Sequence, residues 1–131
     1  MIVLDASVVL EVLLRTPLGD RIADTVFDPR ETLHAPHLMD IEVTQAMRRY
    51  ARGDQVSTEV ANNAVSLLAA FPIRRYEHVP LLSRIWGLRH NLTAYDATYV
   101  ALAEALGATL LTRDRRLAAA PGLGATVQLF A

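Results

Sequence analysis

Four acidic residues in this chain stand where an α/β protein can bring carboxylates together, namely Asp5, Glu42, Asp96 and Asp114. Asp5 and Asp114 lie at or just after short apolar stretches that are typical of buried parallel strands. Glu42 and Asp96 lie in the first turn or so of two apolar helix patterns. Ligands of open α/β sheets gather beyond the carboxyl ends of the strands. We therefore expect the four side chains to converge there, provided that both helices begin at the same edge of the sheet.

Such a cluster of carboxylates needs something to neutralise its charge. Two carboxylates about 4 Å apart repel each other by roughly 4 kcal/mol at a surface-like effective dielectric constant. A hard divalent cation relieves this repulsion, and a site built only from oxygen ligands suits Mg²⁺ or Mn²⁺. These ions serve phosphoryl chemistry, because they activate water and stabilise charge on the phosphorus oxygens. The four acids therefore predict a metal site that acts on a phosphate ester.

Each acid also has a purely structural interpretation. Thr93 and Asp96 fit the S/T-x-x-D/E capping-box pattern at a helix start. Asp114 directly precedes a short helix, where Asp is a favoured N-cap. Glu42 resembles an ordinary glutamate at the margin of an apolar helix face. Asp5 could also be a cap, but it is embedded in MIVLDASVVL, which has no basic residue. Taken together, the positions of the four acids favour a functional interpretation more strongly than any single acid does.

Polar neighbours of these acids extend the candidate site. Ser7 and Thr112 either cap their own chain segments or supply hydroxyls that position a water molecule on the metal. Arg113, Arg115 and Arg116 flank Asp114, and they are candidates for contacts with phosphate. Solvated surface charge is the simpler explanation for most arginines, including the Arg48–Arg49–Arg52 cluster near the end of a helix, where cations are favourable in any case.

Strand and helix patterns alternate along the chain, which predicts an α/β fold with a mainly parallel sheet. We expect strands at 2–4, 33–35 and 125–129, a weaker one at 73–75, and another inside the stretch 94–116. Helices are expected at 7–14, 18–27, 38–52 and 57–70, and from residue 80 to about 90–91. The helices 38–52 and 57–70 should form a hairpin, whose apolar second arm either packs in the core or offers a surface for self-association.

The stretch 94–116 begins with a long apolar helix pattern. Tyr95, Tyr99, Leu102 and Leu106 recur on one helical face, and the opposite face is almost as apolar. The helix should therefore be buried on most sides. We expect both tyrosines to be core residues rather than platforms for stacking bases.

Composition sets outer limits on the fold and function. The 131 residues are enough for one domain, 1–131, and the hydrophobic fraction of 52% argues against disorder. The net charge of -1 gives no global footprint for nucleic acid, and the lack of cysteine excludes disulfides and thiolate metal sites.

The start of the chain lacks the pattern of a signal peptide, and the apolar runs are too short to span a bilayer, so a soluble cytoplasmic protein is expected. The four histidines have no metal-ligand spacing, and neither a P-loop nor G-x-G-x-x-G is present.

The chain resembles the PIN domain, specifically the VapC-type ribonuclease toxins of bacterial toxin–antitoxin pairs. The resemblance is carried by MIVLDASVVL at the start, by Glu42, by AYDATYVALAEALGATLLTRDRRLA and by a final short strand. On this likeness Asp5, Glu42, Asp96 and Asp114 match the acidic quartet of the family, and Ser7 and Thr112 match its accessory hydroxyls. The resemblance implies a three-layer α/β/α fold with about five parallel strands and Mg²⁺-dependent cleavage of RNA. It also implies a homodimer and a cognate VapB-type antitoxin, with which the toxin forms a larger assembly.

Two other functions are compatible with parts of the pattern. A PIN-like scaffold could bind RNA or a protein partner without cutting, and it would leave the acidic pocket without metal. A phosphoacceptor receiver domain also clusters acids at a sheet edge, but it requires a lysine, and all thirteen basic residues of this chain are arginine. We therefore predict a Mg²⁺-dependent endoribonuclease, with Asp5 and Asp96 as direct ligands and Glu42 and Asp114 completing the site or holding water.

Overall fold

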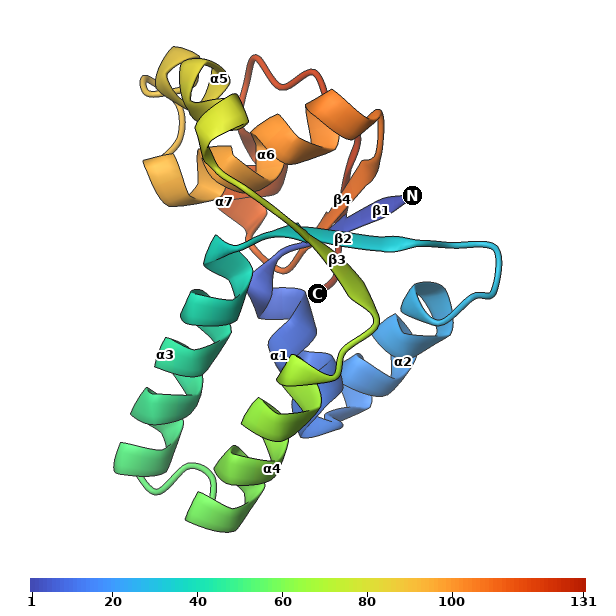
Figure 1. Cartoon of the computed structure of the whole chain (residues 1–131), viewed down its shortest axis with the longest axis vertical. Coiled ribbons are helices and arrows are strands. Elements are labelled where there is room, and N and C mark those ends of the chain that lie inside the picture. Colours follow the sequence, from blue (N-terminus) through green and yellow to red (C-terminus); the bar gives the residue numbers. More distant parts are fainter.

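A computed structural model describes all residues, 1–131, and has three layers in which helices cover both faces of a five-stranded sheet (Figure 1). All strand pairs are parallel, and the strand order is β3-β2-β1-β4-β5. The strands are β1 (Ile2–Leu4), β2 (Leu33–Pro36), β3 (Ile73–Tyr76), β4 (Thr109–Thr112) and β5 (Val127–Leu129). The predicted fold class, a three-layer α/β/α arrangement with a parallel sheet of about five strands and a helical hairpin, is therefore confirmed.

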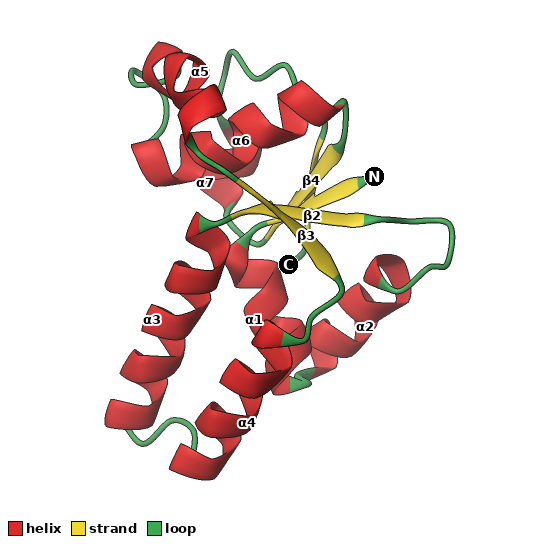
Figure 2. Cartoon of the chain, viewed as in Figure 1, coloured by secondary structure: helices red, strands yellow, loops and turns green.

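The helices divide between the two faces of the sheet according to the direction in which the chain winds (Figure 2). They are α1 (Ala6–Leu14), α2 (Pro17–Val26), α3 (Leu38–Arg52), α4 (Thr58–Ala69), α5 (Leu82–Gly87), α6 (Ala94–Leu106) and α7 (Arg115–Ala119), with a 3₁₀ turn, η1, at Val79–Leu81. Helices α1 to α4 lie on one face, and α5 to α7 lie on the other. This is the division that right-handed crossovers produce when the strand order reverses at β1.

Strand β1 is the centre of the fold, although it has only three residues. All three side chains are buried, as an apolar run covered by helices on both faces requires. Its register aligns Ile2 with Leu33 of β2 and Leu4 with Leu111 of β4. The carboxyl ends of β1 and β4 consequently meet at the point where the strand order reverses, which is the usual position of a binding crevice in such sheets.

Close packing of α1 against α2 depends on a glycine. Helix α1 ends at Leu14, and the next residue, Arg15, has a left-handed conformation with φ 54. Thr16 then caps α2 by accepting a hydrogen bond from the Gly19 amide. A Cβ atom at Gly19 would lie 2.0 Å from the carbonyl oxygen of Glu11. Only glycine allows the two backbones to approach this closely.

The hairpin of α3 and α4 projects away from the sheet, and α3 begins at the edge that carries the carboxyl ends of the strands. The imidazole of His78 accepts a hydrogen bond of 2.9 Å from the Leu38 amide, so a residue that follows β3 satisfies a free amide at the start of α3. Met39, Val43 and Met47 bury one face of the helix. The second arm is only partly in the core, because Val60, Val65 and Leu67 of α4 are exposed while Ala61, Ala64 and Leu68 are buried.

Helix α6 is the most buried helix of the layer that α5, α6 and α7 form. Its residues from Ala97 to Ala103 are all buried, as expected for a helix that is apolar on most sides. Thr93 caps its start, and Gly107 ends it in a left-handed conformation with φ 62. The prediction for Tyr99 is confirmed, because its side chain is 0% exposed. The prediction for Tyr95 is wrong: this side chain is 63% exposed, because it lies at the exposed start of the helix beside Thr93 and Ala94.

Most predicted elements match the structure to within one or two residues, including the weak strand at 73–75, which is the edge strand β3. The helix expected from residue 80 to 90–91 is shorter than predicted, since α5 ends at Gly87. Glycine is a poor helix former, and the following amides make turn-type bonds, such as that of Asn91 to the Leu88 carbonyl. None of the helices combines the length and the apolar character that a membrane span requires.

Candidate active site

The four predicted acids line one cleft at the carboxyl edge of the sheet. This cleft has a volume of about 510 Å³ and lies beyond β1 and β4, between the starts of α3 and α6. Asp5, Glu42, Asp96 and Asp114 all contribute to its wall. The convergence expected from strand ends and helix starts is therefore present in the structure. In this structure no group of three or more acidic or histidine side chains forms a ready set of metal ligands.

Asp5 is the most deeply buried of the four, with a relative exposure of 8%. Its Oδ2 atom accepts hydrogen bonds from the Thr112 hydroxyl at 2.6 Å and from the Ser7 hydroxyl at 3.2 Å. Burial is the main cause that raises the pKa of Asp5, and the negative charge of Asp114 adds to it, whereas the hydrogen bonds from Thr112 and Ser7 oppose the rise. The side chain is thus held in one orientation by neutral donors, with no cation beside it.

Both hydroxyls also accept hydrogen bonds from the loop that follows β4. The Arg113 amide donates to Ser7 at 3.1 Å, and the Asp114 amide donates to Thr112 at 3.0 Å. Each hydroxyl therefore bridges Asp5 to the backbone around Asp114. Their observed role is to fix the relative positions of the two strand ends that carry acids.

Asp114 combines a structural role with a place in the cleft. As the N-cap of α7 it accepts hydrogen bonds at Oδ1 from the Arg116 amide at 2.8 Å and the Leu117 amide at 3.2 Å. Neither bond uses Oδ2, so one oxygen of the carboxylate makes no hydrogen bond within the protein. The capping interpretation of Asp114 is confirmed, and it is compatible with a ligand role.

Asp96 stands in the first turn of α6 and is half-buried. The hydroxyl of Thr93 accepts a hydrogen bond of 3.1 Å from the Asp96 amide, which fixes the helix start and so the position of the carboxylate. Burial raises the pKa of Asp96, and the charges of Asp5 and Asp114 raise it further. Capping by Thr93 and exposure of Asp96 to the acidic cleft therefore occur together.

Glu42 is held by a residue that sequence reasoning assigned only to the core. The Tyr99 hydroxyl donates a hydrogen bond of 2.5 Å to Oε1 of Glu42. Burial raises the pKa of Glu42, the charges of Asp5 and Asp96 add to this, and the Tyr99 bond opposes it. The signal for this role was the spacing, since Tyr99 lies one helical turn after Asp96 and carries a polar tip on an otherwise apolar helix.

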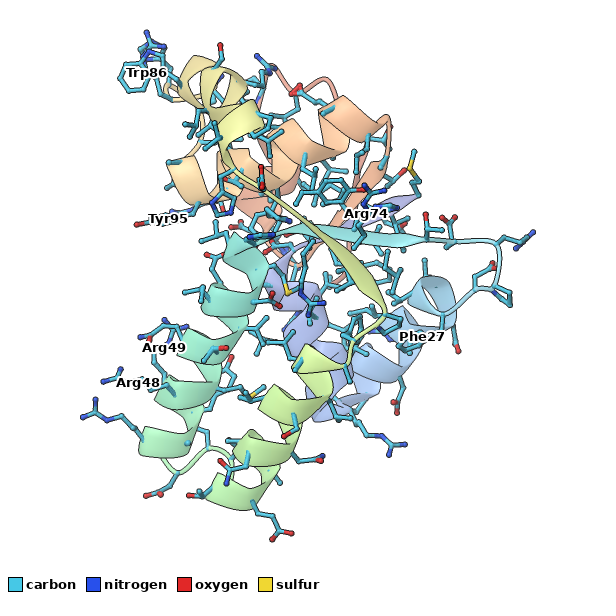
Figure 3. The ribbon with its side chains drawn as sticks, in the orientation of Figure 1. Phe27, Arg48, Arg49, Arg74, Trp86 and Tyr95 are labelled. Atoms are coloured by element: carbon cyan, nitrogen blue, oxygen red, sulfur yellow. The ribbon has the colours of Figure 1, made fainter.

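The arginines near Asp114 do not line the cleft. The guanidinium of Arg113 pairs instead with Glu11 at 2.5 Å, and Arg115 and Arg116 lie on the exposed surface of α7. The arginine that does line the cleft is Arg49 of α3, which the sequence pattern placed among surface charges. In Figure 3, Arg49 and Tyr95 lie on the same side of the molecule and both extend outward from their helices.

The acids of the cleft offer the oxygen donors that a hard divalent cation binds, although their side chains are not drawn together into a ready ligand set in this structure. Every acid in it offers oxygen, and the pKa values of Asp5, Glu42 and Asp96 are all raised by burial and by neighbouring negative charge. The five ion pairs of the structure all use other acids, so no arginine neutralises these carboxylates. Acids that are buried or half-buried in one cleft without a cationic partner require a cation or protons, and oxygen-only ligands favour Mg²⁺ or Mn²⁺.

Comparisons of this chain with known proteins agree on one family. Residues 2–123 match the PIN domain. The chain is 52% identical over 97 residues to Ribonuclease VapC1 of Mycobacterium tuberculosis, which covers 73% of each chain. It is 40% identical to Ribonuclease VapC12 of the same species, and that match of 131 residues covers 100% of this chain and 100% of the relative. Among solved structures, VapBC2 from Rickettsia felis bound to a promoter DNA fragment superposes with a TM-score of 0.72 at 11% identity, covering 100% of each chain.

Proposed function

Because this chain belongs to the PIN domain family and is a relative of the VapC ribonucleases, we propose that it is a metal-dependent endoribonuclease, the toxin of a type II toxin–antitoxin pair. In this proposal it is a hydrolase that cuts RNA phosphodiester bonds, and residues 1–131 act as a single domain. The observation that supports the proposal is the convergence of four carboxylates in one cleft without any cationic partner.

Asp5 and Asp96 are the proposed direct ligands of Mg²⁺, for which Mn²⁺ could substitute, and Glu42 and Asp114 complete the site or hold water. When bound, the cation stabilises negative charge that develops on the phosphate and makes water a stronger nucleophile. Thr112 and Ser7 keep Asp5 in one orientation through their hydrogen bonds. Such fixed positioning lowers the cost of reaching the reactive geometry.

Glu42 is the proposed acceptor of the proton from the attacking water. Burial raises the pKa of Glu42 above the usual glutamate value, and a general base becomes more effective as its pKa approaches the working pH. The Tyr99 hydroxyl binds Oε1, so Oε2 remains available to face water in the cleft. The water then attacks the phosphorus in line with the leaving oxygen of the RNA backbone, and that oxygen departs with a proton from solvent.

The decisive experiment is RNA cleavage by purified variants in the presence of Mg²⁺. Asp5→Asn and Asp96→Asn should each abolish cleavage while circular dichroism shows an unchanged fold. Asp24→Asn is the matched control, because Asp24 is an exposed acid of α2 outside the cleft. Mapping of cut sites in cellular RNA after expression of the wild type beside Asp5→Asn would identify the substrate. Wild-type activity in both cleft variants would contradict the mechanism.

A non-cleaving scaffold that binds RNA or a protein partner is the second candidate. It is favoured by the absence of a ready set of metal ligands among the cleft side chains. Calorimetric titration with Mg²⁺ and Mn²⁺ separates the two candidates. Binding that is lost in Asp96→Asn supports the nuclease, and no binding of either ion supports the scaffold.

A VapB-type antitoxin is the proposed protein partner, and a homodimer is the proposed state of the free toxin, with a larger assembly formed together with the antitoxin. The solved Rickettsia felis structure is a VapBC complex, and the acidic cleft offers a binding site for a cationic side chain. We propose that an antitoxin segment closes the cleft by placing an arginine among the carboxylates. Co-expression with the neighbouring open reading frame tests this, and absence of a stable complex would count against it.

A further inference from the structure

Tyr95 is an aromatic side chain at the rim of the acidic cleft, directly before Asp96 in the first turn of α6. We propose that its ring stacks against a base of single-stranded RNA beside the phosphodiester that is cut. This inference rests on the proposed ribonuclease function and specifies how the same cleft recognises its substrate. It assigns a binding role to a residue that sequence reasoning placed in the core.

No structural role accounts for the Tyr95 side chain. It is 63% exposed, it takes no part in the hydrophobic core, and it is absent from the aromatic and cation–ring contacts of the fold. Tyr99, only one turn further along, is fully buried and uses its hydroxyl to hold Glu42. Water therefore covers the Tyr95 ring face, and a planar apolar partner would displace it favourably.

The wall opposite Tyr95 is suited to a nucleic-acid backbone. Ile41, Gln45 and Arg49 follow one another at intervals of four residues along α3, and all three are exposed and line the cleft. Arg49 takes part in none of the five ion pairs, so its guanidinium can bind a phosphate. The cleft thus passes from four carboxylates to a rim that carries a ring on one side and a cation on the other.

The chemistry of this rim selects an unpaired nucleotide. A base inside a duplex has both faces covered by its neighbours, whereas a base in a loop or single strand can stack on an aromatic side chain. Such stacking tolerates any base, because every base has a π-face. The backbone phosphate on one side of the stacked nucleotide would lie toward the carboxylates, and the phosphate on the other side would lie toward Arg49.

The other aromatic side chains cannot take this place. Tyr50 lines the cleft but packs against the core. Trp86 is 68% exposed, but it lies on α5 outside the cleft, with the Arg89 guanidinium 4.6 Å from its ring centre. Phe27 is exposed at the end of α2 and lines other cavities. Among exposed aromatic residues, Tyr95 alone lines the acidic cleft.

The test compares Tyr95→Ala with Tyr95→Phe, with Trp86→Ala as the control for loss of an exposed ring elsewhere. Each variant is assayed for cleavage of a short single-stranded oligoribonucleotide with Mg²⁺, and its dissociation constant is measured by fluorescence in the Asp5→Asn background. Tyr95→Ala should weaken binding and raise KM by about 5- to 150-fold, the range for loss of one stacked base. Tyr95→Phe and Trp86→Ala should stay near the wild type.

The two readouts keep failure of the inference apart from failure of the proposed function. Absence of cleavage by the wild type refutes the ribonuclease, whatever the variants do. If the wild type cleaves, unchanged KM and affinity in Tyr95→Ala overturn the stacking role. An equal loss in Tyr95→Phe also overturns it, because the hydroxyl and not the ring would then matter. If Tyr95→Ala changes the oligomeric state seen by light scattering but neither KM nor the affinity for RNA, Tyr95 belongs to a protein interface instead.

A second probe tests the selection for unpaired bases. The same oligoribonucleotide annealed to its complement as a blunt duplex should bind the wild type more weakly than the single strand does, and Tyr95→Ala should bring the two affinities closer together. Equal loss of affinity for both probes in Tyr95→Ala would contradict stacking on an unpaired base.

Discussion

The hydroxyl of Thr112 donates a 2.6 Å hydrogen bond to the carboxylate of Asp5, a residue 107 positions earlier in the chain. The bond joins the ends of β1 and β4, the two central strands whose register brings Leu4 beside Leu111. Thr112 is fully buried, and its hydroxyl also accepts a hydrogen bond from the Asp114 amide, so one hydroxyl helps to position two acids of the cleft. The geometry of the site therefore depends on a neutral residue as much as on the acids themselves.

Thr112→Val should keep the shape of the core but remove this bond. Leaving the buried Asp5 carboxylate and the Asp114 amide without this partner should cost about 1–3 kcal/mol of unfolding free energy. Loss of ligand positioning should weaken Mg²⁺ affinity by about 10- to 100-fold. Urea denaturation and calorimetric titration measure the two effects. Thr109→Val at the other end of β4 is the control, and equal Mg²⁺ affinity in both variants would refute the positioning role.

Unfolding free energy without metal should fall as the pH rises from acid toward neutral. Burial and the charges of Asp5 and Asp114 raise the pKa of Asp96 in the fold above its ordinary value, so the folded state holds its proton at pH values where the unfolded chain has lost it. Stability is then highest below the unfolded pKa and declines until the folded pKa is passed. Asp96→Asn, measured by urea denaturation in EDTA, should decline less steeply and be more stable than the wild type at pH 7. A steeper decline in the variant would contradict the raised pKa.

Mg²⁺ should reverse that loss of stability. A cation that binds only the folded state raises the unfolding midpoint by mass action, by about 2–8 °C for each kcal/mol gained. Thermal unfolding at neutral pH, with Mg²⁺ and with EDTA, should show this increase in the wild type and in Asp24→Asn. In Asp96→Asn the increase should be much smaller, and an increase of the same size would remove Asp96 from the ligands.

Tyr99→Phe should change the pH profile of cleavage more than it changes the fold. The Tyr99 hydrogen bond opposes the rise in the pKa of Glu42, so its loss should raise that pKa further. The acidic limb of the rate profile should therefore move to higher pH, with a stability loss of about 0.5–1.5 kcal/mol. Tyr50→Phe is the matched control within the same cleft. An unshifted profile in Tyr99→Phe would exclude Glu42 as the general base.

Arg49→Ala and Arg48→Ala form a matched pair on α3, since both side chains are exposed but only Arg49 lines the cleft. Arg49→Ala should weaken RNA binding at all sequences and reduce the slope of log affinity against log salt by about 0.7, the single-strand value for one phosphate contact. Arg48→Ala should leave the slope unchanged. The experiment is a salt series of binding titrations, and equal slopes for both variants would place the phosphate contact elsewhere.

The elements and the acids could be predicted because their signals are local. Strand β1 ends where its apolar run ends, and Asp5 follows at once; Thr93 marks the start of α6 and so places Asp96. The roles of Tyr95 and Arg49 could not be predicted, because they depend on how each helix is rotated and how far it extends past its neighbours. Periodicity gave Tyr95 and Tyr99 the same face, but only Tyr99 lies under the neighbouring layer. Likewise, Arg113 adjoins Asp114 in sequence, yet in the folded chain its guanidinium forms an ion pair with Glu11.

The central position of β1 has a consequence for synthesis of the protein on the ribosome. Strand β1 has to wait for β4, its neighbour on one side, until the ribosome has added the residues up to Thr112. Before then Asp5, Glu42 and Asp96 have been made, but neither Thr112 nor Asp114 is present to order the cleft. A nascent chain that has not yet reached these residues is therefore expected to lack an ordered cleft, and under the proposed function it would not cut RNA.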